Sequence, residues 1–162
     1  MLQHLSAPWR LAYMSRSDSE PCCIFCAAAN GSEETLTVLR GQRVVALLNR
    51  YPYTSGHLMV APISHVAEFT ALERETLTEL MTAAQRLVKV LEDLYHPHGF
   101  NLGFNLGEAA GAGIVDHLHL HIVPRWRGDT SFMTTSAGVR VLPEALSDTW
   151  SRLVAALGTA DG

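Results

Sequence analysis

The stretch DHLHLHIVPRW, at residues 116–126, holds three of the chain's eight histidines within five positions. His117, His119 and His121 alternate with leucine and isoleucine, an alternation that is typical of a half-buried β-strand. On such a strand the three imidazoles point to one face of the sheet and the apolar side chains point to the other. Neighbouring imidazoles are then expected to stand about 7 Å apart, which suits separate tasks better than one catalytic pair.

Three interpretations of this strand are open. It is a polar, solvent-facing edge that happens to use histidine, or a set of metal ligands, or a nucleophile with its helpers. A neutral imidazole is a competent nucleophile towards phosphorus and can carry a covalent intermediate. A single catalytic zinc held by all three histidines is disfavoured, because side chains about 7 Å apart cannot converge on one ion through bonds of about 2.1 Å.

A second motif is CCIFC, in which Cys23 and Cys26 have the CxxC spacing that lets two thiolates bind one ion. A thioredoxin-like redox pair is an alternative, but the βαβ context that it needs is missing. Two buried free cysteines are another alternative. A zinc site requires two further ligands, for which His65 and one histidine of the triplet are the candidates. Cys22 has no partner in register and is interpreted as a packing residue.

The other patterns predict an α+β fold. Five segments rich in β-forming residues predict strands, at residues 36–40, 44–48, 57–61, 101–106 and 116–126. Helical periodicity covers residues 71–95, and a closing helix is expected over residues 143–157 with proline at its start. The first three strands can form a meander and the last two a hairpin. We therefore expect an antiparallel sheet with the long helix packed on one face.

Length and charge limit the class of protein. The 162 residues carry a net charge of −4, and 48% of them are hydrophobic, which predicts one domain over residues 1–162. Within it we expect an extension at 1–20, a core at 23–124 and the closing helix. Mild acidity argues against a nucleic-acid-binding surface, although a nucleotide can bind in a local pocket. No apolar run approaches the length of a membrane span and no signal peptide is recognised, so a cytoplasmic location is expected.

A glycine-rich loop precedes the histidine strand. Gly107, Gly111 and Gly113 allow backbone N–H groups to approach an anion, although a tight loop uses glycine for its own geometry as well. No cluster of acidic residues for divalent ions lies nearby, which argues against a two-metal phosphatase.

Taken together, these motifs resemble those of the histidine triad (HIT) family. HLHLHIV, at residues 117–123, matches the family's alternation of histidine and apolar residues, and LLNRYPYTSGHLMVAP, at residues 47–62, resembles its nucleotide-binding segment. Three shorter motifs are similar to those of the bacterial branch that resembles diadenosine tetraphosphate (Ap4A) phosphorylases: PWRLAY, CIFC and VPRW. The resemblance covers roughly residues 8–126.

The resemblance implies a nucleotide substrate and a division of roles along the triplet. His119 would attack the α-phosphate and carry a nucleotidyl–imidazole intermediate, while His121 and His57 would flank the phosphates. Asn49 would hold the ribose hydroxyls and Asn105 would contact the phosphate region. Backbone N–H groups of the glycine-rich loop would assist, at Gly111, Gly113 and Ile114.

The resemblance also implies a structural zinc and a dimer. The zinc would be held by Cys23, Cys26, His65 and His117, so that the first histidine of the triplet serves the metal and the second does the chemistry. The family's α+β meander usually forms a homodimer that joins two five-stranded sheets into one. No membrane or nucleic-acid partner is expected.

Two adjacent positions depart from the family's pattern. Many members carry glutamine and a serine or threonine just before the triplet, where the hydroxyl touches the bridging phosphate oxygen. Gly113 and Ile114 stand there in this chain, so only backbone N–H groups remain.

The leading hypothesis is an Ap4A phosphorylase-like enzyme. Phosphate would resolve the intermediate in a phosphorylase and water would resolve it in a hydrolase, and a nucleoside phosphoramidase is a third variant of the same chemistry. A nucleotide-binding scaffold protein is the alternative without catalysis, but binding alone would not need a nucleophile. Incubation with Ap4A, with and without phosphate, separates these possibilities.

Overall fold

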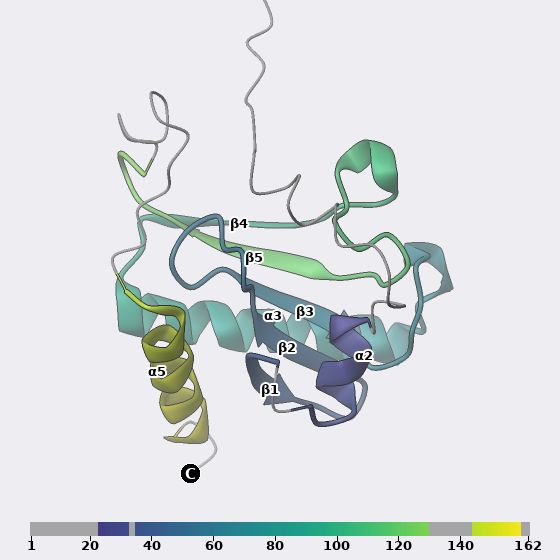
Figure 1. The fold of residues 1–162 in the computed structure, drawn as a ribbon, viewed down its shortest axis with the longest axis horizontal. Helices are drawn as coiled ribbons and strands as arrows, with labels where there is room; N and C mark the ends of the chain where they lie inside the picture. The colour runs from purple at the N-terminus through teal and green to yellow at the C-terminus, as the bar shows by residue number, and fades with distance from the viewer. Residues whose placement is uncertain (1–22, 33–34, 130–143, 160–162) are drawn as a thin grey trace, which may run out of the picture.

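A computed structural model describes residues 23–32, 35–129 and 144–159, and its centre is a five-stranded antiparallel sheet (Figure 1). The strands lie in the order β1-β2-β3-β5-β4. Their bounds are β1 Thr37–Arg40, β2 Val44–Leu48, β3 Leu58–Pro62, β4 Gly99–Phe104 and β5 Leu120–Arg125. The predicted meander of three strands and the predicted final hairpin are both confirmed, and β5 joins the two by pairing with β3.

Helices cover both faces of this sheet. The long helix α3, Arg74–Tyr95, packs on one face, and the short helix α2, Ile24–Ala29, lies on the other, in front of β2 and β3 in Figure 1. The helix α5, Leu146–Thr159, lies against β1 and α3. None of the helices in the described residues is long and apolar enough to cross a membrane.

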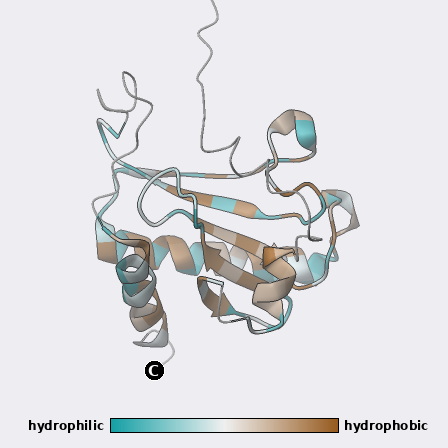
Figure 2. Cartoon of the chain, in the orientation of Figure 1, coloured by the Kyte–Doolittle hydropathy of each residue, from teal (hydrophilic) through white to brown (hydrophobic). Residues whose placement is uncertain are grey.

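The central strands are buried on both faces, because alternate side chains pack against α3 and against α2. All five residues of β2 and all five of β3 are buried, and Figure 2 shows the hydrophobic colour along both strands. Val44, Ala46 and Leu48 pack in the cluster beneath α3, whereas Val45 and Leu47 pack with α2. An uninterrupted apolar run is typical of a strand that is covered on both sides.

The histidine strand is shorter than predicted. The alternation placed all three histidines on the strand, but β5 begins at Leu120, so the first two histidines of the triplet precede it. Leu118 N–H donates to the carbonyl oxygen of Val66 over 2.7 Å, in the loop that follows β3. The chain before β5 is therefore held by that loop and not by the β3 ladder, whose last partners are Val60 and Leu120.

Other element ends also differ from the sequence prediction. The helix predicted over residues 71–95 begins at Arg74, because residues 69–71 form a separate 3₁₀ turn and Glu73 is extended. The glycine-rich loop contains a 3₁₀ turn at Glu108–Ala110, and α2 was not predicted at all. The expectations for residues 1–20, for Cys22 and for a helix start at Pro143 lie outside the described residues.

The helix α5 covers the β1 edge of the sheet. The indole N–H of Trp150 donates to the carbonyl oxygen of Thr37 in β1 over 2.8 Å. Tyr95, at the end of α3, donates its hydroxyl to Glu144, which also pairs with Arg152 at 2.9 Å. Edge strands expose unpaired backbone groups that favour association, and α5 limits this exposure on the β1 side. β4, at the other edge, pairs with β5 alone among the described residues.

Candidate active site and metal centre

The histidines lie on the face of the sheet that carries α2. Leu120 and Ile122 of β5 are buried in the cluster beneath α3, as the alternation predicts. Phe25 of α2 contacts the opposite side of the same segment, with ring centroids 5.1 Å from His117 and 4.8 Å from His119. The predicted separation into an apolar face and a histidine face is therefore confirmed.

The imidazoles are closer together than the sequence predicted. Ring centroids of His119 and His121 lie 4.8 Å apart, in an edge-to-face arrangement, instead of about 7 Å. The prediction was wrong for this pair because it assumed parallel side chains on a regular strand, whereas His119 precedes β5. His57, just before β3, completes a compact group, with its centroid 5.2 Å from that of His121.

The four residues predicted to bind zinc converge on one point. Cys23 and Cys26 come from α2 and the residue before it, His65 from the loop after β3, and His117 from the segment before β5. Their candidate ligand atoms lie within 4.8 Å of one another. Cys23 Sγ is 3.2 Å from His117 Nδ1, and Cys26 Sγ is 3.2 Å from His65 Nδ1.

The geometry fits a tetrahedral metal site. Bonds of about 2.0–2.3 Å place neighbouring ligand atoms of a tetrahedron about 3.3–3.8 Å apart, close to the distances found here. His117 Nε2 lies 2.9 Å from the carbonyl oxygen of Pro62, and this hydrogen bond leaves the Nδ1 lone pair facing the thiols. Burial lowers the pKa of His117, which favours the neutral form that a metal ligand requires. These four residues could hold a metal ion with no position open for substrate.

His119 has one ring nitrogen held by a backbone carbonyl. Its Nδ1 lies 2.8 Å from the carbonyl oxygen of His117, so Nδ1 carries the proton and donates it. The prediction that a backbone carbonyl holds one ring nitrogen is confirmed, and the lone pair is on Nε2. His119 is only 5% exposed, and burial lowers its pKa, so the ring is neutral at pH 7.

The remaining predicted polar residues form a chain of contacts that leads to His121. His57 Nε2 lies 3.0 Å from His121 Nδ1, and the Asn49 amide nitrogen lies 3.3 Å from His57 Nδ1. The Asn105 amide is 3.5 Å from His121 Nε2. Burial, with a smaller contribution from the charge of His119, lowers the pKa of His121 to about 4. The His121 ring is therefore uncharged at neutral pH.

The glycine-rich loop differs in detail from the expected anion cradle. Gly111 N–H donates to the Glu108 carbonyl over 2.9 Å, so this amide is already used within the 3₁₀ turn. The Ile114 side chain packs against the cluster around Phe25, on the α2 side of the sheet. Ile114 thus anchors the loop to α2, and an approach to phosphate there would use its backbone. Gly113 is exposed.

Two aromatic residues of this site were missed from the sequence. Phe25 stands between the two cysteines and packs on two histidines, and Tyr53 lies over His57 with ring centroids 4.5 Å apart. Phe25 lies within the CxxC motif and Tyr53 four residues before His57, and this closeness in sequence is the available signal.

Comparison with known proteins gives a consistent result. Residues 30–128 match the HIT domain, a span that includes every predicted site residue except the two cysteines. The AP-4-A phosphorylase of Mycobacterium tuberculosis (strain CDC 1551 / Oshkosh) is 42% identical over 157 residues, covering 91% of this chain and 80% of that protein.

Solved structures with this fold include other histidine triad proteins. A zinc-bound histidine triad family protein from Mycobacterium smegmatis is 30% identical with a TM-score of 0.70, covering 92% of this chain and 97% of that one. A hypothetical histidine triad nucleotide-binding protein from Sulfolobus tokodaii is 27% identical, also with a TM-score of 0.70, covering 86% and 94%.

The titration of His121 tests the environment of this site. We expect its ring to take up a proton near pH 4, because burial disfavours the charged form. In the His119→Asn variant the pKa of His121 should rise, since the positive charge that His119 carries when protonated at acidic pH is removed, but should stay below 6.5 because burial is the larger cause. Histidine ring NMR shifts measured against pH report both values. A pKa of His121 at or above 6.5 in the unaltered protein would contradict the described packing.

Proposed function

Because the chain belongs to the HIT family, we propose that it transfers or hydrolyses nucleotidyl groups at the α-phosphate of Ap4A or a related adenosine nucleotide. The observation that carries this proposal is the hydrogen bond from His119 Nδ1 to the His117 carbonyl, which leaves Nε2 as a neutral nucleophile. The similarity to a protein named AP-4-A phosphorylase, over most of both chains, favours phosphorolysis as the complete reaction.

The proposed reaction has two steps. The Nε2 lone pair of His119 attacks the α-phosphorus of Ap4A, the bond from that phosphorus to the bridging oxygen breaks, and ATP leaves. Inorganic phosphate then attacks the adenylyl–imidazole, the P–N bond breaks, and ADP leaves with Nε2 restored. His121 would donate a hydrogen bond to a phosphate oxygen as negative charge builds up. Asn49 would hold the ribose, and Asn105 and the backbone at Gly113 and Ile114 would contact the phosphates.

Incubation with Ap4A tests the reaction class. We expect ADP and ATP in the presence of phosphate, and little turnover in its absence. Formation of AMP and ATP without phosphate would instead indicate a hydrolase, in which water resolves the same intermediate. Cleavage of a nucleoside phosphoramidate with no action on Ap4A would replace this proposal by the third variant of the chemistry. Binding without turnover of either substrate would indicate a nucleotide-binding scaffold.

Replacement of His119 by asparagine tests the nucleophile. Loss of an attacking group costs many orders of magnitude, so we expect turnover to fall by about 10⁴- to 10⁶-fold. Mass spectrometry should detect an adenylylated protein with the unaltered chain and none with His119→Asn. Replacement of His121 by asparagine should cost less, about 10²- to 10³-fold, as for one electrostatic stabiliser. An adduct mapped to His121, or activity of more than a few per cent in His119→Asn, would contradict these roles.

We propose further that the Cys23, Cys26, His65 and His117 group binds one structural zinc per chain. Two thiolates and two imidazoles are a ligand set that zinc prefers, and a zinc-bound family member shares the fold. Bound zinc would cross-link α2 to the two segments that flank the sheet. No reaction step is assigned to it.

Substitution of Cys23 tests the zinc proposal. Because metal-binding energy is coupled to folding, Cys23→Ala should lose zinc and several kcal/mol of unfolding free energy. The matched control is Ile24→Ala, the exposed next residue at the start of α2, which should keep both. Elemental analysis and thermal unfolding measure the two effects. A zinc-free native protein, or a melting temperature unchanged by chelation, would argue against a structural zinc.

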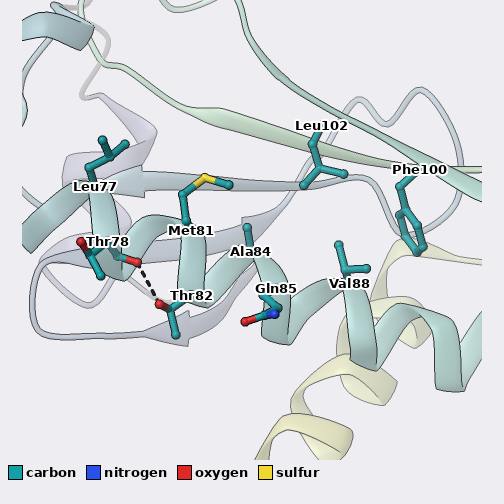
Figure 3. A pocket seen from close by; sticks show the side chains of 9 residues that line it. All are labelled: Leu77, Thr78, Met81, Thr82, Ala84, Gln85, Val88, Phe100 and Leu102. Atoms are coloured by element: carbon teal, nitrogen blue, oxygen red, sulfur yellow. Dashed lines mark hydrogen bonds between the residues drawn. The ribbon is translucent and has the colours of Figure 1, made fainter. Parts of the chain in front are cut away.

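We propose that the protein is a homodimer that pairs through β4 and α3. These elements form an apolar groove, seen in Figure 3, which is lined by Leu77, Met81, Val88, Phe100 and Leu102 among others. Met81 is 48% exposed and Leu102 is 45% exposed, and contiguous exposed apolar residues are typical of an interaction surface. The groove lies beside the edge of the sheet that α5 does not cover. A second copy would therefore bury the apolar groove and pair with the exposed edge strand.

Charged substitutions in the groove test the dimer. The double variant Met81→Glu and Leu102→Glu should be monomeric, because burying the carboxylates at an apolar interface is costly. Val154→Glu, on the exposed side of α5, is the control and should remain dimeric. Analytical ultracentrifugation at micromolar concentration measures the state. A monomeric unaltered protein would contradict the proposal.

A further inference from the structure

Tyr53 belongs to the turn between β2 and β3 and contacts the histidine group in two ways. Its backbone N–H donates to His57 Nδ1 over 3.1 Å, and its ring lies 4.5 Å from the His57 ring. We infer that Tyr53 is a positioning residue, which holds His57 so that His121 presents an Nε2–H group to the substrate. This inference rests on the proposed function, because it assigns the role of Tyr53 in that reaction.

The first step concerns the proton on His57. A backbone N–H can only donate, so His57 Nδ1 must accept from Tyr53 and carries a lone pair. The Asn49 amide nitrogen, 3.3 Å away, is a second donor to the same atom. The orientation of that amide is fixed, because Asn49 Oδ1 accepts from Tyr51 N–H over 2.9 Å. Neutral His57 therefore has its proton on Nε2.

The second step concerns the proton on His121, whose position follows from that of the proton on His57. His57 Nε2 lies 3.0 Å from His121 Nδ1, so His57 donates and His121 Nδ1 accepts. Neutral His121 then has its proton on Nε2, the atom 3.5 Å from the Asn105 amide. If the Asn105 side-chain amide is rotated by a half-turn, its oxygen takes the place of its nitrogen beside His121 Nε2. That oxygen then accepts the Nε2 proton in the absence of substrate. The His121 tautomer is thus determined two hydrogen bonds away, by the backbone N–H of Tyr53.

The tautomer matters for the chemistry. His121 is neutral at pH 7, so it can stabilise a phosphate oxygen only through an N–H donor on the correct nitrogen. In the other tautomer the Nε2 lone pair would face a negatively charged oxygen and repel it. His57 has both ring nitrogens engaged by protein groups, and it therefore acts through His121 rather than on the substrate.

The ring of Tyr53 keeps this arrangement in place. Tyr53 is 41% exposed whereas His57 is fully buried, and the Tyr53 ring also stacks on His121 with centroids 6.0 Å apart. The turn beneath it is fixed, since Thr54 donates its hydroxyl to the Pro124 carbonyl over 2.7 Å. Gly56 adopts a φ of +74°, and a Cβ there would meet a methyl of Leu91 at 2.8 Å, so the turn packs directly on α3.

Two variants distinguish the contribution of the Tyr53 ring from that of its hydroxyl. Tyr53→Phe keeps both the ring and the N–H and should behave like the unaltered protein. Tyr53→Ala keeps the N–H but removes the ring, so His57 gains room to turn and kcat should fall by about 10- to 100-fold, a typical cost of misplaced catalytic groups, with little change in KM. Thermal unfolding and zinc content should match in all three proteins.

The decisive measurement is the tautomer of each histidine, read from long-range ¹⁵N–¹H NMR spectra of the substrate-free protein. We expect Nε2–H at both His57 and His121 in the unaltered protein and in Tyr53→Phe, and a mixture of tautomers at His121 in Tyr53→Ala. The first two spectra test the inference without relying on the alanine variant to fold. They are also independent of turnover, so a failure to cleave Ap4A would overturn the proposed function and not the hydrogen-bond chain.

Three results would overturn the inference. The first is Nδ1–H at His121 in the unaltered protein. The second is a raised KM with unchanged kcat in Tyr53→Ala, which would make Tyr53 a stacking surface for a substrate base. The third is equal loss of activity in the Phe and Ala variants, which would assign the role to the hydroxyl.

Discussion

The hydrogen bond between His119 Nδ1 and the His117 carbonyl joins the two halves of the site. His117 turns its side chain to the Cys2His2 group while its main-chain oxygen orients the neighbouring imidazole. Its Nε2 is bonded in turn to Pro62, at the end of β3. Any displacement of His117 would therefore disturb the cysteine group, the end of a central strand and the His119 ring together. This dependence gives the proposed metal site, to which no reaction step is assigned, a structural reason to lie beside the proposed nucleophile.

The two-residue period of β5 places apolar side chains on one face of the sheet and a histidine on the other. Leu120 and Ile122 are buried beneath α3, while the alternate position, His121, faces the α2 side. On that side, Phe25 of α2 packs against the imidazoles of His117 and His119. Burial on this face also lowers the pKa of His119 and of His121, so the packing of this side of the sheet contributes directly to the charge state of both rings.

Local patterns predicted most of the fold and the metal group, and long-range contacts account for the errors. Alternation and helical period located all five strands and α3. CxxC with His65 and the triplet gave the candidate metal ligands, and the resemblance to the HIT family selected His117 among the three. The start of β5 depends on the bond from Leu118 to Val66, which no local pattern encodes. The six-residue helix α2 is too short to show a period. The closeness of His119 and His121, and the contact of Tyr53 with His57, arise from side-chain directions that are fixed only by tertiary packing.

The indole of Trp150 has a consequence for how the protein assembles. Sheets that pair edge to edge can extend without limit when both edges are available. Here α5 lies across β1, and Trp150 bonds a carbonyl of that strand, so β4 is the edge left for pairing in the described part of the chain. In the proposed dimer, two copies that join through β4 would use up that edge in each other. Growth of the sheet would then be self-limiting, because α5 and the Trp150 hydrogen bond cover the β1 edge of each copy.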